Sequence, residues 1–236
     1  IDDVREIMSK EKHRDFPVLD TDGKYVGMIS RRNLLNMKKK QLIISVGREF
    51  GSGGHEIAQG LADHYGLTMY DHDLLKEIAA KKNLNGDELT AYDEVKWNRF
   101  LYRTVRGLNS SPEQNVANLQ FEYLREKAKA GDSFVVVGRC SETILREYKC
   151  LVSIFVGGDI SKKAERVMKY YNMTEKEARE FMKEKDKRRK QYHNRYCEIA
   201  WGDSRNYDLS INSSRLGIDG TIQTLIQYID ARIAIM

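Results

Sequence analysis

The chain has 236 residues, of which 41% are hydrophobic and 32% charged, and its net charge is +5. This composition is typical of a globular protein with one domain, or one domain and a smaller appendage, and excludes a disordered or fibrous chain. No apolar run approaches the roughly 20 residues of a membrane span, and no signal-peptide pattern is present. The three cysteines form no C-x-x-C pair, which argues against a disulfide framework or a cysteine-rich zinc site and favours the reducing cytoplasm.

The first 40 residues predict a β-hairpin between two helical segments. The strands are expected at 16–19 and 25–30, and the helices at 2–10 and around Leu34-Leu35. The turn DTDG, which begins at Asp20, holds an Asp-Gly pair between apolar runs, and this is a strong hairpin signal. A unit of this size rarely buries a core alone, so we expect it to need a partner segment.

From Gln41 onward, short apolar strands alternate with helical patterns. The expected strands are 42–46, 67–70, 133–137, 151–156 and 207–211. Helical patterns fill the stretches between them, dominate from Leu74 to about Lys129, and return from Ile218 to the C-terminus. This alternation predicts an α/β fold with a parallel sheet covered on both faces, whose ligands bind beyond the carboxyl ends of the strands.

Two helix ends carry their own signals. Gly66 supplies the stop for the helix that begins after the first buried strand. Thr174, with Glu177 three residues later, predicts a capping box at the start of a helix before the last strand.

The stretch GREFGSGGHE, residues 47–56, joins a predicted strand to a predicted helix. A glycine-rich loop in that place directs main-chain N–H groups at one point, and the helix dipole adds attraction for an anion. In the usual G-x-x-x-x-G-K-[ST] signature, however, Gly54 stands at the lysine and His55 at the hydroxyl residue. We assign phosphate or ATP binding to Gly51, Ser52, Gly53, Gly54 and His55, and the charge of the missing lysine to Arg48. The alternative is a tight turn without a ligand.

A basic segment, EKDKRRKQYHNRY, precedes the last strand and predicts a mobile lid. At helical spacing Lys185 shares a face with Arg188 or Arg189. Phosphoryl transfer needs positive charge around the moving group, and a lid would supply it while excluding water. The alternative is a solvated basic face. Arg139, at the end of the strand SFVVV, would face the ligand crevice, unless it is a salt-bridged surface residue.

From about Gln41 to the C-terminus the chain resembles the cytidylate kinase-like proteins, relatives of the P-loop nucleoside monophosphate kinases. The matching segments are IISVGREFGSGGHEIAQGLADHYGL, YDHDLL, VVVGRCSETIL, EKDKRRKQYHNRY and NYDLSINSSRLGIDG. The resemblance implies a three-layer P-loop kinase fold with a five-stranded parallel sheet and a helical lid. It also implies ATP with Mg²⁺ as phosphoryl donor and a nucleoside monophosphate such as CMP as acceptor.

The resemblance also carries residue roles. The arginine of the G-R-D motif corresponds to Arg139, and the D-x-x-R of the lid to Asp186 with Arg189, or Arg188 if the register shifts by one. We therefore assign acceptor binding to Arg139, Asp186 and Asp71, catalysis to Arg48, Arg188 and Arg189, and no metal ligand. Cys140 replaces the aspartate of G-R-D, and YDHDLLKE, which contains Asp71, replaces the acceptor-contacting DSGAxYR. These departures put cytidine specificity in doubt.

Residues 1 to about 37 resemble the second half of a CBS motif, carried by DFPVLDTDGKYVGMISRRNLL. In such modules a [ST]-x-x-D stretch binds adenosine-type ligands, and here it reads Ser30-Arg31-Arg32-Asn33. We divide the chain into a partial CBS-like segment, 1–40, and a kinase-like domain, 41–236. The segment is interpreted as a remnant of a regulatory region, a cropped piece, or a docking surface for a partner chain or a second copy.

The leading hypothesis is an ATP-dependent kinase acting on a nucleoside monophosphate. The second is a nucleotide sensor or scaffold without turnover, linked to the CBS-type region. Nucleic-acid binding through the basic runs receives little weight, because no stripe of aromatic and basic residues is present.

Overall fold

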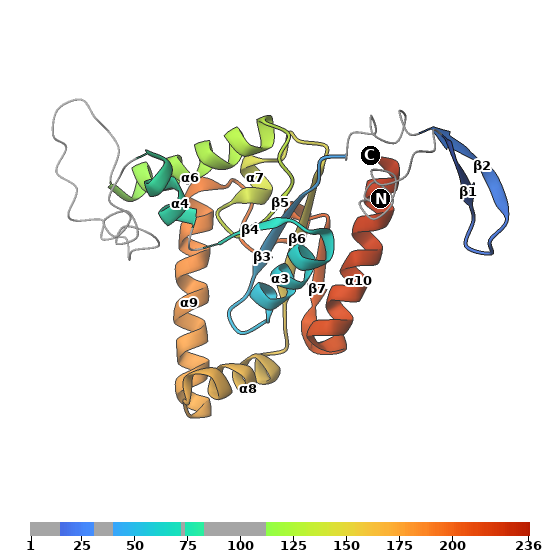
Figure 1. Cartoon of the computed structure of the whole chain (residues 1–236). Helices are drawn as coiled ribbons and strands as arrows, with labels where there is room; N and C mark the ends of the chain where they lie inside the picture. The colour runs from blue at the N-terminus through green and yellow to red at the C-terminus, as the bar shows by residue number, and fades with distance from the viewer. Residues whose placement is uncertain (1–14, 31–39, 72–73, 83–111) are drawn as a thin grey trace. The chain divides into compact units, whose positions relative to one another are not determined.

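The computed structural model describes residues 15–30, 40–71, 74–82 and 112–236. The chain divides into two units, Ile1–Lys40 and Gln41–Met236 (Figure 1). The helices expected at 2–10 and around Leu34-Leu35, residues 31–33 of the CBS-like stretch, and the helical patterns of 83–111 lie outside the described residues.

The first unit contains the predicted hairpin. Strand β1 (Asp15–Leu19) pairs antiparallel with β2 (Tyr25–Ser30). The Asp20 carboxylate accepts hydrogen bonds from the main-chain N–H groups of Asp22 and Lys24, at 3.0 and 2.8 Å. Gly23 takes a φ of 78°, which glycine adopts without strain. The predicted Asp-Gly turn is therefore confirmed, and the Asp20 side chain stabilises it through hydrogen bonds to nearby main-chain groups.

The second unit is built on a five-stranded parallel sheet, as predicted (Figure 1). Its strand order is β4-β5-β3-β6-β7. The strands are β3 (Ile43–Arg48), β4 (Thr68–Tyr70), β5 (Phe134–Val137), β6 (Leu151–Gly157) and β7 (Leu209–Asn212). All the paired neighbours run parallel, so the carboxyl ends of the strands share one edge.

Helices cover both faces of this sheet, which makes three layers. Alternate side chains of one strand point to opposite faces: Ile44 and Val46 pack beneath α3 (Gly54–Tyr65) and α10 (Ser213–Ile235), whereas Ile43 packs on the other side. The second face is covered by α4 (Leu74–Lys82), α6 (Pro112–Lys129) and α7 (Ser141–Ile144). Burial on both faces explains why the strands are continuous apolar runs.

Two further helices pack against each other, and the second carries the basic segment predicted to act as a lid. Helix α8 (Ile160–Tyr171) packs against the long α9 (Glu175–Tyr196) through Ala164, Val167, Ala178 and Met182. Phe50, from the glycine loop, joins this small core, so the loop and the helix pair share a contact. Figure 1 shows the two helices extending away from the sheet beyond the loop.

The helix ends follow their local signals. The capping box is confirmed, since Thr174 accepts from the Glu177 N–H and Glu177 accepts from the Thr174 N–H. Gly66, with a φ of 62°, ends α3 as predicted. Helix α10 begins at Ser213 rather than Ile218, because the Asn212 side chain caps a first turn. That turn is separated by Gly217, whose ψ of −175° is not helical, so the regular helix does resume at Ile218.

Candidate active site

The loop between β3 and α3 presents main-chain N–H groups at the carboxyl edge of the sheet. Gly51 and Gly53 each have a φ of 78°, a left-handed conformation that favours glycine. Gly53 is the N-cap of α3, and no side chain caps this helix end. The N–H groups of the first turn and the helix dipole therefore suit an anion such as phosphate.

Ser52 belongs to the same loop, but its hydroxyl is directed into the protein. The side chain is buried and donates to the Glu49 carbonyl at 2.8 Å. The Ser52 carbonyl in turn accepts from Ser213 Oγ at 2.6 Å. The main-chain N–H of Ser52 also donates to the Glu49 carbonyl, at 3.3 Å, so both donors of Ser52 serve to shape the loop.

Arg48 and Gly54 occupy one space between them. A Cβ built on Gly54 would lie 2.6 Å from the Cβ of Arg48, closer than real Cβ atoms approach, and 3.1 Å from its Cδ, a tight contact. The other end of Arg48 reaches toward β5, where its Nη1 lies 3.7 Å from a Cβ built on Gly138. The Arg48 side chain can therefore cross the loop only because position 54 holds glycine and not lysine.

Two cavities open at this edge of the sheet. One, of about 480 Å³, lies at the glycine loop and is lined by residues including Gly51, Gly53 and Arg166. The other, of about 390 Å³, lies at the end of β5 and is lined by residues including Arg139 and Asp71. Three side chains line both cavities: Arg48, His55 and Arg189. A group passing from one cavity to the other would move between these three.

The β5 cavity is walled mainly by side chains. Arg139 is buried and has a φ of 60°, a left-handed conformation that is uncommon for arginine. Asp71 is buried at the end of β4, with its carboxylate 3.3 Å from Nδ1 of His55. The aromatic rings of Trp201 and Tyr207 complete one side. The cavity thus combines cationic, anionic and apolar surfaces.

Arg189 is the lid arginine that faces the cavities. Its Nη1 donates to the Arg48 carbonyl at 3.2 Å, and its guanidinium lies 5.2 Å from the centre of the Phe50 ring. These contacts hold the guanidinium beside the glycine loop, where it would meet a phosphate.

The structure does not bring Arg188 and Asp186 into either cavity. Arg188 bonds Glu184 one turn earlier at 2.8 Å and lines neither space. Asp186 accepts the Phe50 N–H at 2.7 Å, so it joins α9 to the glycine loop instead of pointing at the β5 cavity. Burial raises the pKa of the Asp186 carboxyl above its ordinary value, against the lowering effect of the Phe50 N–H and of Arg189.

Helix α8 supplies loop contacts that the sequence did not single out. Arg166 Nη1 donates to the Gly51 carbonyl at 2.7 Å, and Lys163 Nζ lies 2.7 Å from Oε2 of Glu49. The same Glu49 oxygen accepts the Gly158 N–H at 3.1 Å. In the sequence, the spacing of three residues between Lys163 and Arg166 indicates that the two side chains share a helix face, but not that this face meets the loop.

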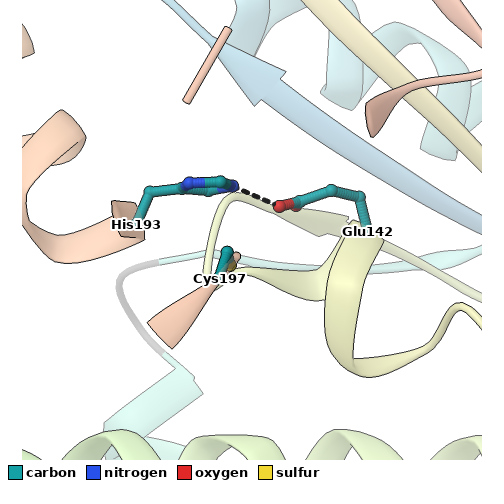
Figure 2. Close-up of side chains that lie close together, drawn as sticks. All are labelled: Glu142, His193 and Cys197. Carbon is teal, nitrogen blue, oxygen red and sulfur yellow. Dashed lines mark hydrogen bonds and ion pairs between the residues drawn. The ribbon is translucent and has the colours of Figure 1, made fainter. Parts of the chain in front are cut away.

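Three buried side chains, Glu142, His193 and Cys197, form a cluster (Figure 2), and the first two line the β5 cavity. His193 Nε2 is 2.7 Å from Oε1 of Glu142, and the two side chains are 6% and 2% exposed. One donor atom from each of the three residues lies within 4.8 Å of the other two. Cys140 lies beside them, hydrogen-bonded through its side chain to Cys197. We shall call Glu142, His193 and Cys197 the buried triad.

The charges of the buried triad follow from these contacts. Burial lowers the pKa of His193, but hydrogen bonds with Cys197 and Glu142 outweigh it and raise the pKa to about 10. The hydrogen bond from Cys140 lowers the pKa of Cys197, burial opposes it, and with the His193 bond the pKa reaches about 6. The bond to Cys197, together with burial, raises the pKa of Cys140. These hydrogen bonds favour the charged forms of His193 and Cys197.

Comparison with known proteins decides the family. The sequence model described as the cytidylate kinase-like family matches residues 43–215, most of the chain. The chain belongs to the cytidylate kinase-like family. A second model, the CBS domain, matches residues 1–40.

Relatives and solved structures agree with this family. The cytidylate kinase of Pyrococcus horikoshii is 28% identical over 198 residues, which are 82% of this chain and 91% of the relative. The cytidylate kinase of Halobacterium salinarum is 23% identical over 194 residues, 80% of this chain and 90% of the relative. A solved structure of an uncharacterized protein from Eubacterium ventriosum superposes with a TM-score of 0.65 and 39% identity, covering 80% of this chain and 99% of that one. The predicted kinase-type α/β fold of this family is thus confirmed.

Among the residues that the structure describes, no helix combines the length and apolar character needed to cross a membrane.

Proposed function

We propose that this member of the cytidylate kinase-like family transfers the terminal phosphoryl group of ATP to a nucleoside monophosphate of the CMP type. The observation that carries the proposal is the junction of the two cavities, where Arg48, His55 and Arg189 line both spaces. A kinase needs two nucleotide sites that meet where the phosphoryl group moves, with positive charge at that point.

The glycine loop would hold the phosphates of ATP through its main chain. The N–H groups of Gly51, Gly53, Gly54 and the start of α3 suit the negative oxygens. Arg48 would provide the charge that a loop lysine usually carries, from the opposite side of the loop. Arg189 would approach from the lid, so that the two guanidinium groups flank the transferring phosphoryl group.

The acceptor would occupy the β5 cavity. A phosphate oxygen of the monophosphate attacks the terminal phosphorus of ATP, the bond to the bridging oxygen breaks, and ADP leaves with the electron pair. The acceptor phosphate is already a nucleophile, so no general base is required. Arg139 would bind the acceptor phosphate, whereas the ring faces of Trp201 and Tyr207 would pack against the base.

Asp71, in the wall of the β5 cavity beside His55, fits a Mg²⁺ ion that arrives with the nucleotide. Mg²⁺ in such sites takes one or two carboxylates beside the substrate phosphates, and Asp71 places a carboxylate in the cavity wall next to His55. When bound, the ion would neutralise charge on the phosphates. Asp71 would hold it directly or through water, as well as facing the acceptor.

A nucleotide sensor without turnover is the second candidate. It is favoured by the CBS match at residues 1–40 and by Gly54 in place of the loop lysine. In that case the first unit would bind a partner chain or a second copy and transmit nucleotide occupancy. For either function the cytoplasm, which keeps thiols reduced, stays our prediction for the location.

The direct test incubates the protein with ATP, Mg²⁺ and each common nucleoside monophosphate, and separates the products by chromatography. We expect ADP and the diphosphate of one acceptor, CMP before others, in equal amounts. ATP binding by calorimetry without any diphosphate product would establish the sensor and refute the kinase. ADP without a matching diphosphate would indicate hydrolysis and would also refute it.

A further inference from the structure

The buried triad combines three ligand types that divalent transition ions prefer. Imidazole nitrogen, carboxylate oxygen and thiolate sulfur together suit Zn²⁺, which is borderline in softness. In a tetrahedral zinc site with ordinary bond lengths the donor atoms lie about 3.5 Å apart. The donor atoms of Glu142, His193 and Cys197 all lie within 4.8 Å of one another, so small side-chain adjustments would bring them to that spacing.

Hydrogen bonds from neighbouring polar groups hold the side chains of the buried triad in place. The other ring nitrogen of His193, Nδ1, lies 3.3 Å from Oδ1 of Asn194, leaving Nε2 directed at the triad. Oδ1 of Asn194 is itself fixed by the Trp201 N–H at 2.8 Å. Glu142 accepts from Nδ2 of Asn206 at 3.3 Å. Hydrogen bonds of this kind fix the tautomer and ring position of metal-binding histidines.

Two segments that are distant in sequence meet at the triad. His193 and Cys197 lie four residues apart, on one face at the end of α9, and Glu142 belongs to the first turn of α7. Arg189 lies one turn before His193 on the same helix. An ion held here would therefore tie α9 to α7, one helical turn from the arginine that lines both cavities.

We propose that Glu142 Oε1, His193 Nε2 and Cys197 Sγ bind one Zn²⁺-class divalent ion at the wall of the β5 cavity. The fourth position would be taken by water from the cavity, or by the thiol of Cys140, which lies against Cys197. The site is independent of the phosphate loop, so it stands whether or not the chain is a kinase.

The primary test uses the untagged full chain, since a histidine tag would bind metal. After removal of metal with a chelator, Zn²⁺ is titrated against a chromophoric competitor, and bound metal is counted by plasma mass spectrometry. We expect one ion per chain. With Co²⁺ as probe, we expect a thiolate-to-cobalt charge-transfer band and the intense visible bands of tetrahedral coordination.

Variants locate the ion. Glu142→Gln, His193→Gln and Cys197→Ser should each weaken Zn²⁺ binding by more than about 100-fold, because even loss of an outer-shell partner costs about 10- to 100-fold. Asn194→Ala should fall in that smaller range. Cys150→Ser is the matched control, since Cys150 is a free cysteine outside the triad, and its affinity should equal that of the parent.

A measurement on the unaltered chain guards against variants that fail to fold. Zn²⁺ should slow alkylation of Cys197 by iodoacetamide, mapped by peptide mass spectrometry, while leaving alkylation of Cys150 unchanged. Unslowed alkylation of Cys197, a cobalt complex without a thiolate band, or affinity retained in folded Cys197→Ser would each overturn the site. All these readouts are independent of phosphoryl transfer, so a failed kinase assay would leave them unaffected.

Discussion

The cavity at the glycine loop and the cavity at the end of β5 meet at Arg48, yet they are built from different groups. The loop cavity offers main chain, with Gly51 and Gly53 in left-handed conformations and the open start of α3, among side chains from the loop, α8 and α9. The β5 cavity owes its chemistry to side chains, several of them buried and charged. A main-chain site recognises any polyphosphate, whereas a side-chain site changes its ligand with each substitution. The difference suggests that relatives can keep one donor while differing in acceptor.

The largest effect is expected at the junction of the two cavities. Arg189→Ala should lower kcat by about 10³-fold, because an arginine beside the transferring phosphoryl group contributes 10³ or more. Arg188→Ala, one residue away on the same helix, should change kcat by less than about threefold, since Arg188 bonds Glu184 outside both cavities. Steady-state kinetics on both variants decide the question. Equal losses would show that the lid acts by general charge and would remove Arg189 from the mechanism.

A second experiment moves the positive charge from position 48 to position 54 of the loop. Gly54→Lys should lower kcat/KM by about 100-fold, because its Cβ would collide with Arg48 and overpacking costs about 1–3 kcal/mol. The double variant Arg48→Gly, Gly54→Lys places the lysine of the usual loop signature and removes the collision, so it should regain at least about tenfold. A double-mutant cycle measures the coupling. Additive effects of the two changes would contradict the shared space of Arg48 and Gly54.

The contrast between the cavities predicts separable kinetic effects. Arg139→Lys should raise the KM for the acceptor about tenfold and leave the KM for ATP unchanged, because lysine cannot replace the two-pronged guanidinium contact. Ser52→Ala should instead lower the free energy of unfolding by about 1 kcal/mol through loss of a buried hydrogen bond, without changing the acceptor KM. A rise in the ATP KM of Arg139→Lys would show that the two sites are not distinct.

The smallest effect concerns the pH dependence of stability at Asp186. Burial raises the pKa of this carboxyl in the folded chain, so the folded state binds more protons than the unfolded state at pH values above the ordinary aspartate pKa. Relative to Asp186→Asn, the parent should gain stability as the pH falls into that range, and lose this gain as the pH rises through the folded pKa. Denaturant melts of both proteins between pH 4 and pH 7, roughly the range around and above that pKa, provide the comparison. An opposite slope would show that Arg189 outweighs burial.

Much of this fold could be predicted from the sequence, because its signals lie in neighbouring residues. The alternation of apolar strands and helices predicted the parallel sheet, and Thr174 with Glu177 predicted the start of the lid helix. The glycine loop likewise lies between strand and helix as expected. The last strand covers Leu209–Asn212 rather than 207–211. The terminal helix gains a first turn from Ser213, because Asn212 caps that turn ahead of the break at Gly217.

The placement of the site residues could not be predicted from the sequence, because it depends on contacts between distant segments. The sequence left Arg188 and Arg189 as alternatives, and the packing of α9 against α8 and Phe50 sets the helix rotation that places Arg189 at the cavities. The place assigned to Asp186 also changed, because its carboxylate caps the Phe50 N–H.

The amino-acid sequence by itself determined the order of elements, the glycine loop and the family resemblance, because each is written in neighbouring residues. Tertiary structure alone decided that Arg48 lies where a lysine at position 54 would stand, and that Glu142 meets His193 and Cys197. The physical reason is that the first contact depends on how the loop turns, and the second joins His193 to Glu142 across 51 residues through packing, so neither separation carries a period.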